Sequence, residues 1–188
     1  MAIYNVAETT NISGKCFSMI YGNAIENGAV VKKGAIMEGE REIYAAGIPA
    51  IGDEVFLVAN PAWNYDDGSV INQNEDAYIN VANKPFRTYG LLANHHDRFG
   101  VMDYGITPAQ ASGEDLAPAV GDYIGVDTTT TKLKNFGATA PVDADDRGFI
   151  GKIVDINNYG YAIPTGTAGT ISTATKMVVI EVIKNETV

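Results

Sequence analysis

Glu54-Val55-Phe56-Leu57-Val58-Ala59 is the strongest strand signal in the first half of this sequence. Five apolar residues follow Glu54 in a row, and the turn sequence Pro49-Ala50-Ile51-Gly52-Asp53 comes directly before it. A short apolar run next to a turn is typical of a strand buried on both faces, because a half-buried strand alternates polar with apolar residues. The segment therefore predicts a β-strand with no solvent-facing side.

Similar apolar segments recur along the rest of the chain, with turn residues between them. Asn27-Gly28 favours a tight turn, since both residue types tolerate a positive φ. No segment has the apolar stripe of a helix. Short strands at near-regular spacing predict a mostly β fold, namely a small antiparallel barrel or sandwich with an extended N-terminal arm, long loops and little helix. The expected strands are residues 16–21, 29–34, 42–46, 54–59, 86–92, 98–104, 123–126, 132–136, 148–156 and 177–183.

The same patterns predict how the chain is divided. Residues 1–13 are polar and read as an extended arm, and residues 14–106 as a β lobe that contains a long polar loop at 60–83. After a linker-like segment, residues 117–188 read as a C-terminal β-barrel lobe, although one continuous domain is the alternative. The turn at 49–53 recurs as Pro118-Ala119-Val120-Gly121-Asp122, again before an apolar strand, which leaves an internal duplication open.

Charge and composition exclude several classes of function. The chain has 188 residues and a formal net charge of −10, and its Lys and Arg residues are scattered, so we expect no direct contact with nucleic acid. Cys16 is the only cysteine, which excludes an intramolecular disulfide and favours a buried thiol. The start lacks a signal peptide, and no apolar stretch approaches the ~20 residues of a membrane helix. We expect synthesis in the cytoplasm and no membrane contact.

No residue pattern indicates catalysis, a cofactor or a metal site. His95-His96-Asp97 contains both histidines of the chain, and no third histidine is present to complete a zinc site. Asp143, Asp145 and Asp146 favour a charged turn over a calcium loop, because the downstream Glu that such a loop requires is missing. We therefore expect a protein that is not an enzyme, with no cofactor, metal ligand or catalytic residue.

Several exposed-prone residues are candidates for contact with a partner. Trp63 and Tyr65 lie in the polar loop, and protein interfaces favour large aromatic side chains. His95 and His96 are expected in a solvated loop or against a partner. The polar arm and the long loop are both able to become ordered on a neighbouring molecule.

Four stretches of the chain, taken together, resemble a known group of proteins. They are residues 25–31, residues 39–44 leading to 53–59, residues 83–91 running into 97–101, and residues 149–152 with 177–182. They are similar to small structural proteins encoded in the head-gene region of tailed phages that infect Gram-positive bacteria. The resemblance spans most of the chain and does not include a catalytic or metal-binding motif.

This resemblance implies a capsid decoration or cement protein, made in the host cytoplasm and located on the outside of the virion capsid. Its implied partners are the major capsid protein and other copies of itself, with a trimer favoured. The arm would add a strand to a neighbour or lie along it, through Ala2, Ile3, Tyr4, Asn5 and Val6. Alternative functions are a virion-surface module that binds host glycans through Trp63 or Tyr65, a tail or connector component, and a small hydrolase that uses the clustered carboxylates.

Overall fold

The computed structural model describes residues 4–61, 78–111, 114–159, 163–165, 170–172 and 175–188. Its described residues are mostly β-strand, and their helical segments are short 3-10 turns, which confirms the predicted mostly β fold. No helix in these ranges has the length and apolar character needed to cross a membrane. Cys16 is exposed, so the expectation that its thiol is buried was wrong.

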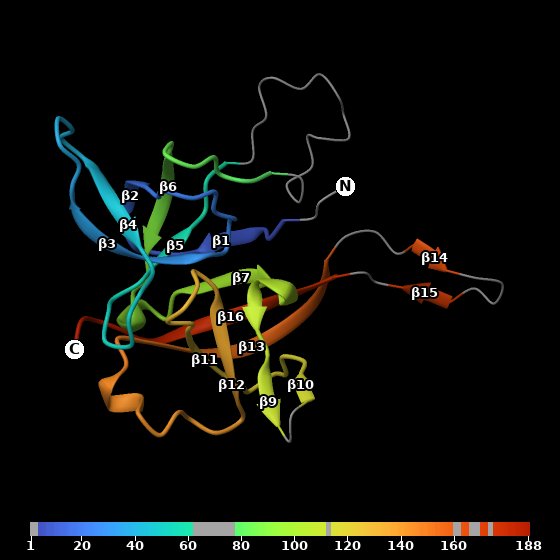
Figure 1. Ribbon diagram of the computed structural model, residues 1–188. Helices are drawn as coiled ribbons and strands as arrows, with labels where there is room; N and C mark the ends of the chain where they lie inside the picture. Colours follow the sequence, from blue (N-terminus) through green and yellow to red (C-terminus); the bar gives the residue numbers. More distant parts are fainter. Residues whose placement is uncertain (1–3, 62–77, 112–113, 160–162, 166–169, 173–174) are drawn as a thin grey trace.

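The first group of strands closes into a five-stranded barrel in the order β2-β4-β3-β5-β6 (Figure 1). β2 and β4 run parallel, and the other neighbouring pairs run antiparallel. Gly28 has a φ of 79° before β3, as the Asn27-Gly28 turn requires. The strands are β2 (Cys16–Ile20), β3 (Val30–Ile36), β4 (Ile43–Gly47), β5 (Phe56–Val58) and β6 (Pro85–Gly90).

The second group forms a seven-stranded sheet in the order β1-β7-β16-β13-β11-β12-β8. Its neighbouring strands are antiparallel except for β12 and β8. The strands are β1 (Ala7–Asn11), β7 (Arg98–Met102), β8 (Ile106–Thr107), β11 (Tyr123–Val126), β12 (Leu133–Gly137), β13 (Phe149–Tyr159) and β16 (Thr175–Asn185). Two small hairpins pair β9 (Ala109–Ala111) with β10 (Glu114–Leu116) and β14 (Ile163–Thr165) with β15 (Thr170–Ser172).

β5 is buried on both faces, as its apolar run predicts. Val55 and Leu57 belong to a core that also contains residues of the seven-stranded sheet, such as Phe99. Phe56 and Val58 belong to a second core, whose buried members all come from the barrel and its loops. Because successive side chains of a strand point to opposite faces, one strand contributes to both cores. One face of β5 thus packs in the barrel interior, and the other packs in the core between the barrel and the seven-stranded sheet.

The strands are not divided as the predicted segments are. β1, from the predicted arm, and β7 and β8, from the predicted first lobe, hydrogen-bond within the sheet that contains the C-terminal strands. The core that contains Leu57 is shared between that sheet and the barrel. Within the described residues, the barrel and the sheet therefore pack as one continuous body.

The repeated five-residue turn has the same hydrogen bonds in both places. The amide of Ala50 donates to Oδ2 of Asp53 at 2.7 Å, and the amide of Ala119 donates to Oδ2 of Asp122 at 3.0 Å. Each aspartate amide also donates back to the alanine carbonyl. An Asp that closes such a turn accounts for the shared sequence by local chemistry, so the repeat does not require a duplication.

Candidate docking site at the edge strand β1

β1 is an end strand of the seven-stranded sheet, and its sequence is polar. It pairs with β7 through Ala7 opposite Val101, Glu8 opposite Gly100 and Asn11 opposite Arg98, with an irregularity between Glu8 and Asn11. On its other side, β1 has no strand neighbour in the described part of the chain. An edge of this kind presents backbone N–H and C=O groups to which an incoming strand can pair.

Buried polar side chains hold both ends of β1. Before the strand, Oδ1 of Asn5 accepts a hydrogen bond from the amide of Met102 at 2.9 Å, and the amide of Asn5 donates to Glu26 at 2.9 Å. After it, Oδ1 of Asp97 accepts from the amide of Ser13 at 3.0 Å. Asn5 and Asp97 are only 2% and 1% exposed. β1 is therefore positioned by its own chain and not by a neighbour.

A surface groove of about 470 Å³ lies at the C-terminal end of β1. One side consists of the end of the predicted arm, and the other of the segment that contains both histidines. The structure thus brings together two of the three regions that the sequence indicates as contact candidates. The lining residues are Thr10, Asn11, Ile12, Ser13, His95, His96 and Arg98.

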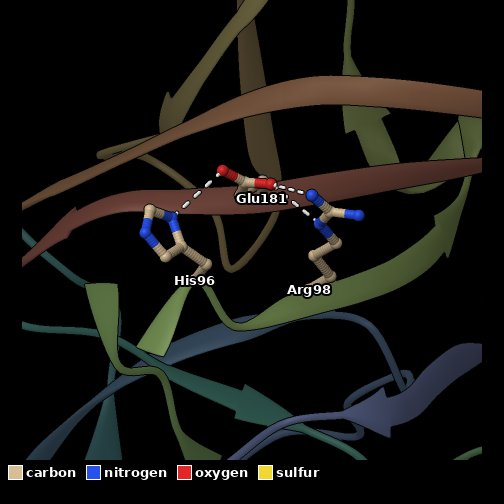
Figure 2. Close-up of polar contacts among 3 residues, drawn as sticks. All are labelled: His96, Arg98 and Glu181. Carbon is tan, nitrogen blue, oxygen red and sulfur yellow. Dashed lines mark hydrogen bonds and ion pairs between the residues drawn. The ribbon is translucent and has the colours of Figure 1, made fainter. Parts of the chain in front are cut away.

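A network of three charged or chargeable side chains borders this groove. Nε of Arg98 donates to Oε2 of Glu181 at 2.7 Å, and Nδ1 of His96 lies 3.3 Å from Oε1 of the same carboxylate (Figure 2). The hydrogen bond from Arg98, together with the charges of Arg98 and His96, lowers the pKa of Glu181. The His96 side chain nevertheless remains 77% exposed. Glu181 thereby orients two donors at the edge of the groove.

A second, smaller groove of about 190 Å³ lies at the N-terminal end of β1. Val6, Ala7 and Thr9 line one side of it. The opposite side is the barrel, at the point where the polar loop begins. The lining residues on that side are Asn27, Ala59, Asn60, Pro61 and Tyr89.

Asparagine side chains tie together the two ends of the polar loop beside this groove. The Asn27 side chain donates to the carbonyl of Asn60 at 2.9 Å and accepts from the amide of Asn60 at 3.0 Å. Asn80, on the returning segment, donates to Oδ1 of Asn27 at 3.1 Å, and Asn60 donates to the hydroxyl of Tyr78 at 2.7 Å. The loop therefore starts and ends at a fixed place next to β1.

The predicted contact residues differ in their exposure to solvent. His95 and His96 are exposed in the groove. Asn5 and Val6, at 2% and 4% exposure, are buried inside the chain, so their side chains are not accessible to a partner. The physical reason is that β1 completes its own sheet, and the segment before it must pack beneath that sheet.

Tyr4 is half-buried, and its carbonyl accepts a hydrogen bond from the Tyr104 hydroxyl. Four predicted contact residues lie outside the described residues, namely Ala2, Ile3, Trp63 and Tyr65. The glycan-binding hypothesis depends on two of them, Trp63 and Tyr65. Sequence reasoning assigned no role to Arg98, Asp97 or Glu181. Arg98 meets Glu181 across 83 residues, and Asp97 meets the amide of Ser13 across 84 residues, and such distant contacts leave no local pattern.

Asp143 of the acidic cluster forms an ion pair with Arg147, four residues later in the chain. Nε and one terminal nitrogen of Arg147 donate to the two oxygens of Asp143, at 2.8 and 2.9 Å. These hydrogen bonds lower the pKa of Asp143. In the ranges that the structure describes, no three His, Cys, Asp or Glu side chains are grouped so that they could hold a metal ion.

A larger groove of about 540 Å³ lies between β8, β9 and β12, away from the predicted contact residues. Its charged lining consists of Asp115 and Lys134, which form no recognisable catalytic set. No family model matches the chain, and comparison with curated proteins and with solved structures yields no match either.

Proposed function

We propose that this protein is a phage capsid decoration or cement protein that docks on the outer surface of the shell through the free edge of β1. The observation that supports this proposal is the convergence at β1 of the three regions indicated by the sequence. The arm is β1 itself, the histidines line the groove at one end, and the polar loop begins at the groove at the other end. The family resemblance supplies the identity of the partner.

Docking at this edge relies on main-chain hydrogen bonds. A strand of the major capsid protein that pairs with β1 would satisfy the open backbone groups, and the two grooves would receive its flanking side chains. Because β1 is already held by Asn5 and Asp97, little conformational entropy is lost on binding. Many such contacts on one repeating shell add up through avidity.

The acidic character of the chain fits a position outside the shell. A net charge of −10 would repel packaged nucleic acid, whereas an outward-facing protein does not meet it. On the β1 side of the larger of the two grooves, Thr10, Asn11 and Ser13 offer uncharged hydroxyl and amide groups, so adhesion there does not require a strongly basic surface.

The test adds purified protein to undecorated capsids of the phage that encodes the chain. Co-sedimentation and a higher capsid melting temperature are the expected results. Thr10→Glu combined with His95→Glu places charge in the groove and should weaken binding at least ten-fold, because an incoming strand would have to desolvate both carboxylates.

The matched control is Asn23→Glu combined with Thr187→Glu, which makes the same charge change at exposed positions outside both grooves. This control should bind as the unaltered protein does. Absence of binding by the unaltered protein would refute the decoration function. Equal binding by the two double variants would refute the assignment of the docking edge to β1.

A further inference from the structure

The longest uncharged stretch of the chain begins within β13 and ends at the first residue of β16. Residues 156–175 are 20 consecutive residues without Lys, Arg, Asp, Glu or His, and the next longest such stretch, residues 55–65, has 11. Charged residues make up 19% of the chain as a whole. The centre of a protein–protein interface is usually depleted of charged residues.

The stretch starts in the last part of β13, which forms a ribbon with β16, and β7 borders β16 on its other side as far as Met177. β13 and β16 pair along their whole length, from Phe149 opposite Asn185 to Tyr159 opposite Thr175. β11 pairs with β13 only at Gly151 and Lys152. In Figure 1 the ribbon leaves the body of the sheet in the direction of β14 and β15. From Asp155 to Tyr159, β13 therefore has a strand neighbour on one side only among the described residues.

From Ile156 to Tyr159, the open edge contains no charge, bulge or proline, which are the features with which proteins usually block unwanted strand pairing. A register irregularity between Ile153 and Asp155 lies at the base of the ribbon and not along it. The Asp155 carboxylate accepts hydrogen bonds from the amide of Ile156 at 2.9 Å and the side chain of Asn157 at 3.1 Å, so it folds back on its own strand. Asn157 and Asn158 are exposed.

We infer that this edge, Asp155–Tyr159 of β13, pairs antiparallel with the same edge of a second copy of the chain. Two molecules with a net charge of −10 repel each other, and this ribbon is where their backbones approach with the least charge between them. β8, β10, β14 and β15 have two or three residues each, which is too short for a stable ladder. β1 is the edge proposed above for the shell, so it is not assigned to a second copy.

A two-fold axis at Asn157 gives the register that suits the charges. It places Asp155 of one copy opposite Tyr159 of the other, which separates the two Asp155 residues by roughly 14 Å along the strands. An isologous contact of this kind is closed, so it yields a dimer and no filament. It uses a different edge from the one proposed for the shell, and either contact can fail without the other.

Light scattering of the purified protein tests the pairing. The expected mass is twice the 20.0 kDa of the chain. Asn157→Lys combined with Asn158→Lys brings four like charges together at the two-fold axis, and this variant should have the mass of a single chain. Asn23→Lys combined with Thr187→Lys makes the same charge change at exposed sites elsewhere and should remain a dimer. A monomeric or trimeric unaltered protein, or a dimeric ribbon variant, would overturn the inference.

A cross-link tests the register without perturbing the edge by charge. In a Cys16→Ser background, Asn157→Cys places two thiols directly opposite each other, within the Cα separation of a disulfide. Mild oxidation should convert most of the protein into a covalent dimer, whereas Asn23→Cys in the same background should not cross-link. Little covalent dimer from the Asn157→Cys protein, with its melting temperature unchanged, would exclude this register and with it the two-fold pairing.

Discussion

Asp97 joins three segments that are far apart in the sequence. Its carboxylate accepts hydrogen bonds from the amides of Ser13, at 3.0 Å, and Leu92, at 2.8 Å, and its carbonyl accepts from the amide of Val182. A buried carboxylate is tolerated only when its oxygens are satisfied in this way. The sequence indicates the neighbouring His95 and His96 as contact candidates, but Asp97 is the residue that fixes where β1 ends.

Asp127 has the largest resolved pKa change of the described residues. Partial burial raises its pKa, but hydrogen bonds from the side chain and amide of Thr129, with Thr130 and Thr107, outweigh burial and lower the pKa to about 2. The Thr129 hydroxyl lies 2.7 Å from Oδ1, and the Thr107 hydroxyl lies 3.1 Å from Oδ2. The carboxylate therefore stabilises the turn between β11 and β12 in its ionised form.

Asp127→Asn should lower the free energy of unfolding by about 1 kcal/mol at pH 7, a value reduced for solvent screening. Because the folded pKa lies below the unfolded value of about 3.9, the contribution is complete above pH ~4 and is lost as the pH falls towards 2. Urea unfolding at several pH values measures it, with Glu38→Gln as an exposed control. If the unfolding free energies of Asp127→Asn and the unaltered protein differ as much at pH 2 as at pH 7, the ionised Asp127 carboxylate is not what stabilises the turn.

At the scale of elements, the end of β16 is attached to the barrel by a single side chain. Oδ1 of Asn185 accepts from the amide of Val55 at 2.9 Å, and its Nδ2 donates to the carbonyls of Val55, at 2.9 Å, and Leu91, at 3.0 Å. Val55 directly precedes β5, whose two faces supply both cores. Asn185 thus sets the position of the central strand relative to the sheet.

Asn185→Ala should lower the free energy of unfolding by about 2–3 kcal/mol, because three hydrogen bonds are lost and their backbone partners remain partly buried. Chemical denaturation measures the change, with the exposed Thr187→Ala as a control that should alter stability very little. A loss below about 0.5 kcal/mol would mean that water replaces the amide at no cost and that Asn185 does not hold barrel to sheet.

At the scale of the whole molecule, the shared core decides how the protein unfolds. Val30, Leu57 and Leu91, from the barrel and its following loop, pack in one buried cluster with Phe149 and Ile180 from the sheet. Separation of the two parts would expose this apolar surface to water, at about 25 cal/mol for each Å². Neither part therefore has a complete core of its own on that side.

We expect a single cooperative thermal transition, with equal calorimetric and van't Hoff enthalpies once the mass of the native species is taken into account. Scanning calorimetry at two protein concentrations measures both enthalpies. The monomeric Asn157→Lys/Asn158→Lys variant provides a control without dimer dissociation. Two resolved transitions in that variant would show that barrel and sheet unfold independently.

Local patterns in the sequence determined the elements. β5, β13 and β16 were predicted because apolar runs and their turn residues act over a few positions, and a residue's own backbone preference does not depend on distant contacts. The burial of Val55, Phe56, Leu57 and Val58 followed from the same run. The low content of helix also followed from the sequence, since no apolar stripe of helical period is present.

Tertiary structure alone decided which strands lie side by side, and hence where the candidate site is. Residues 7–11 pair with β7 of their own chain, and His96 meets a glutamate 85 positions away. Strand edges are chemically alike, so the choice among partners depends on which arrangement buries the most apolar surface in the complete molecule. The two grooves beside β1 result from that choice, and so does the edge of β13 that has no strand neighbour in the described part of the chain. Neither feature has a counterpart in any single segment.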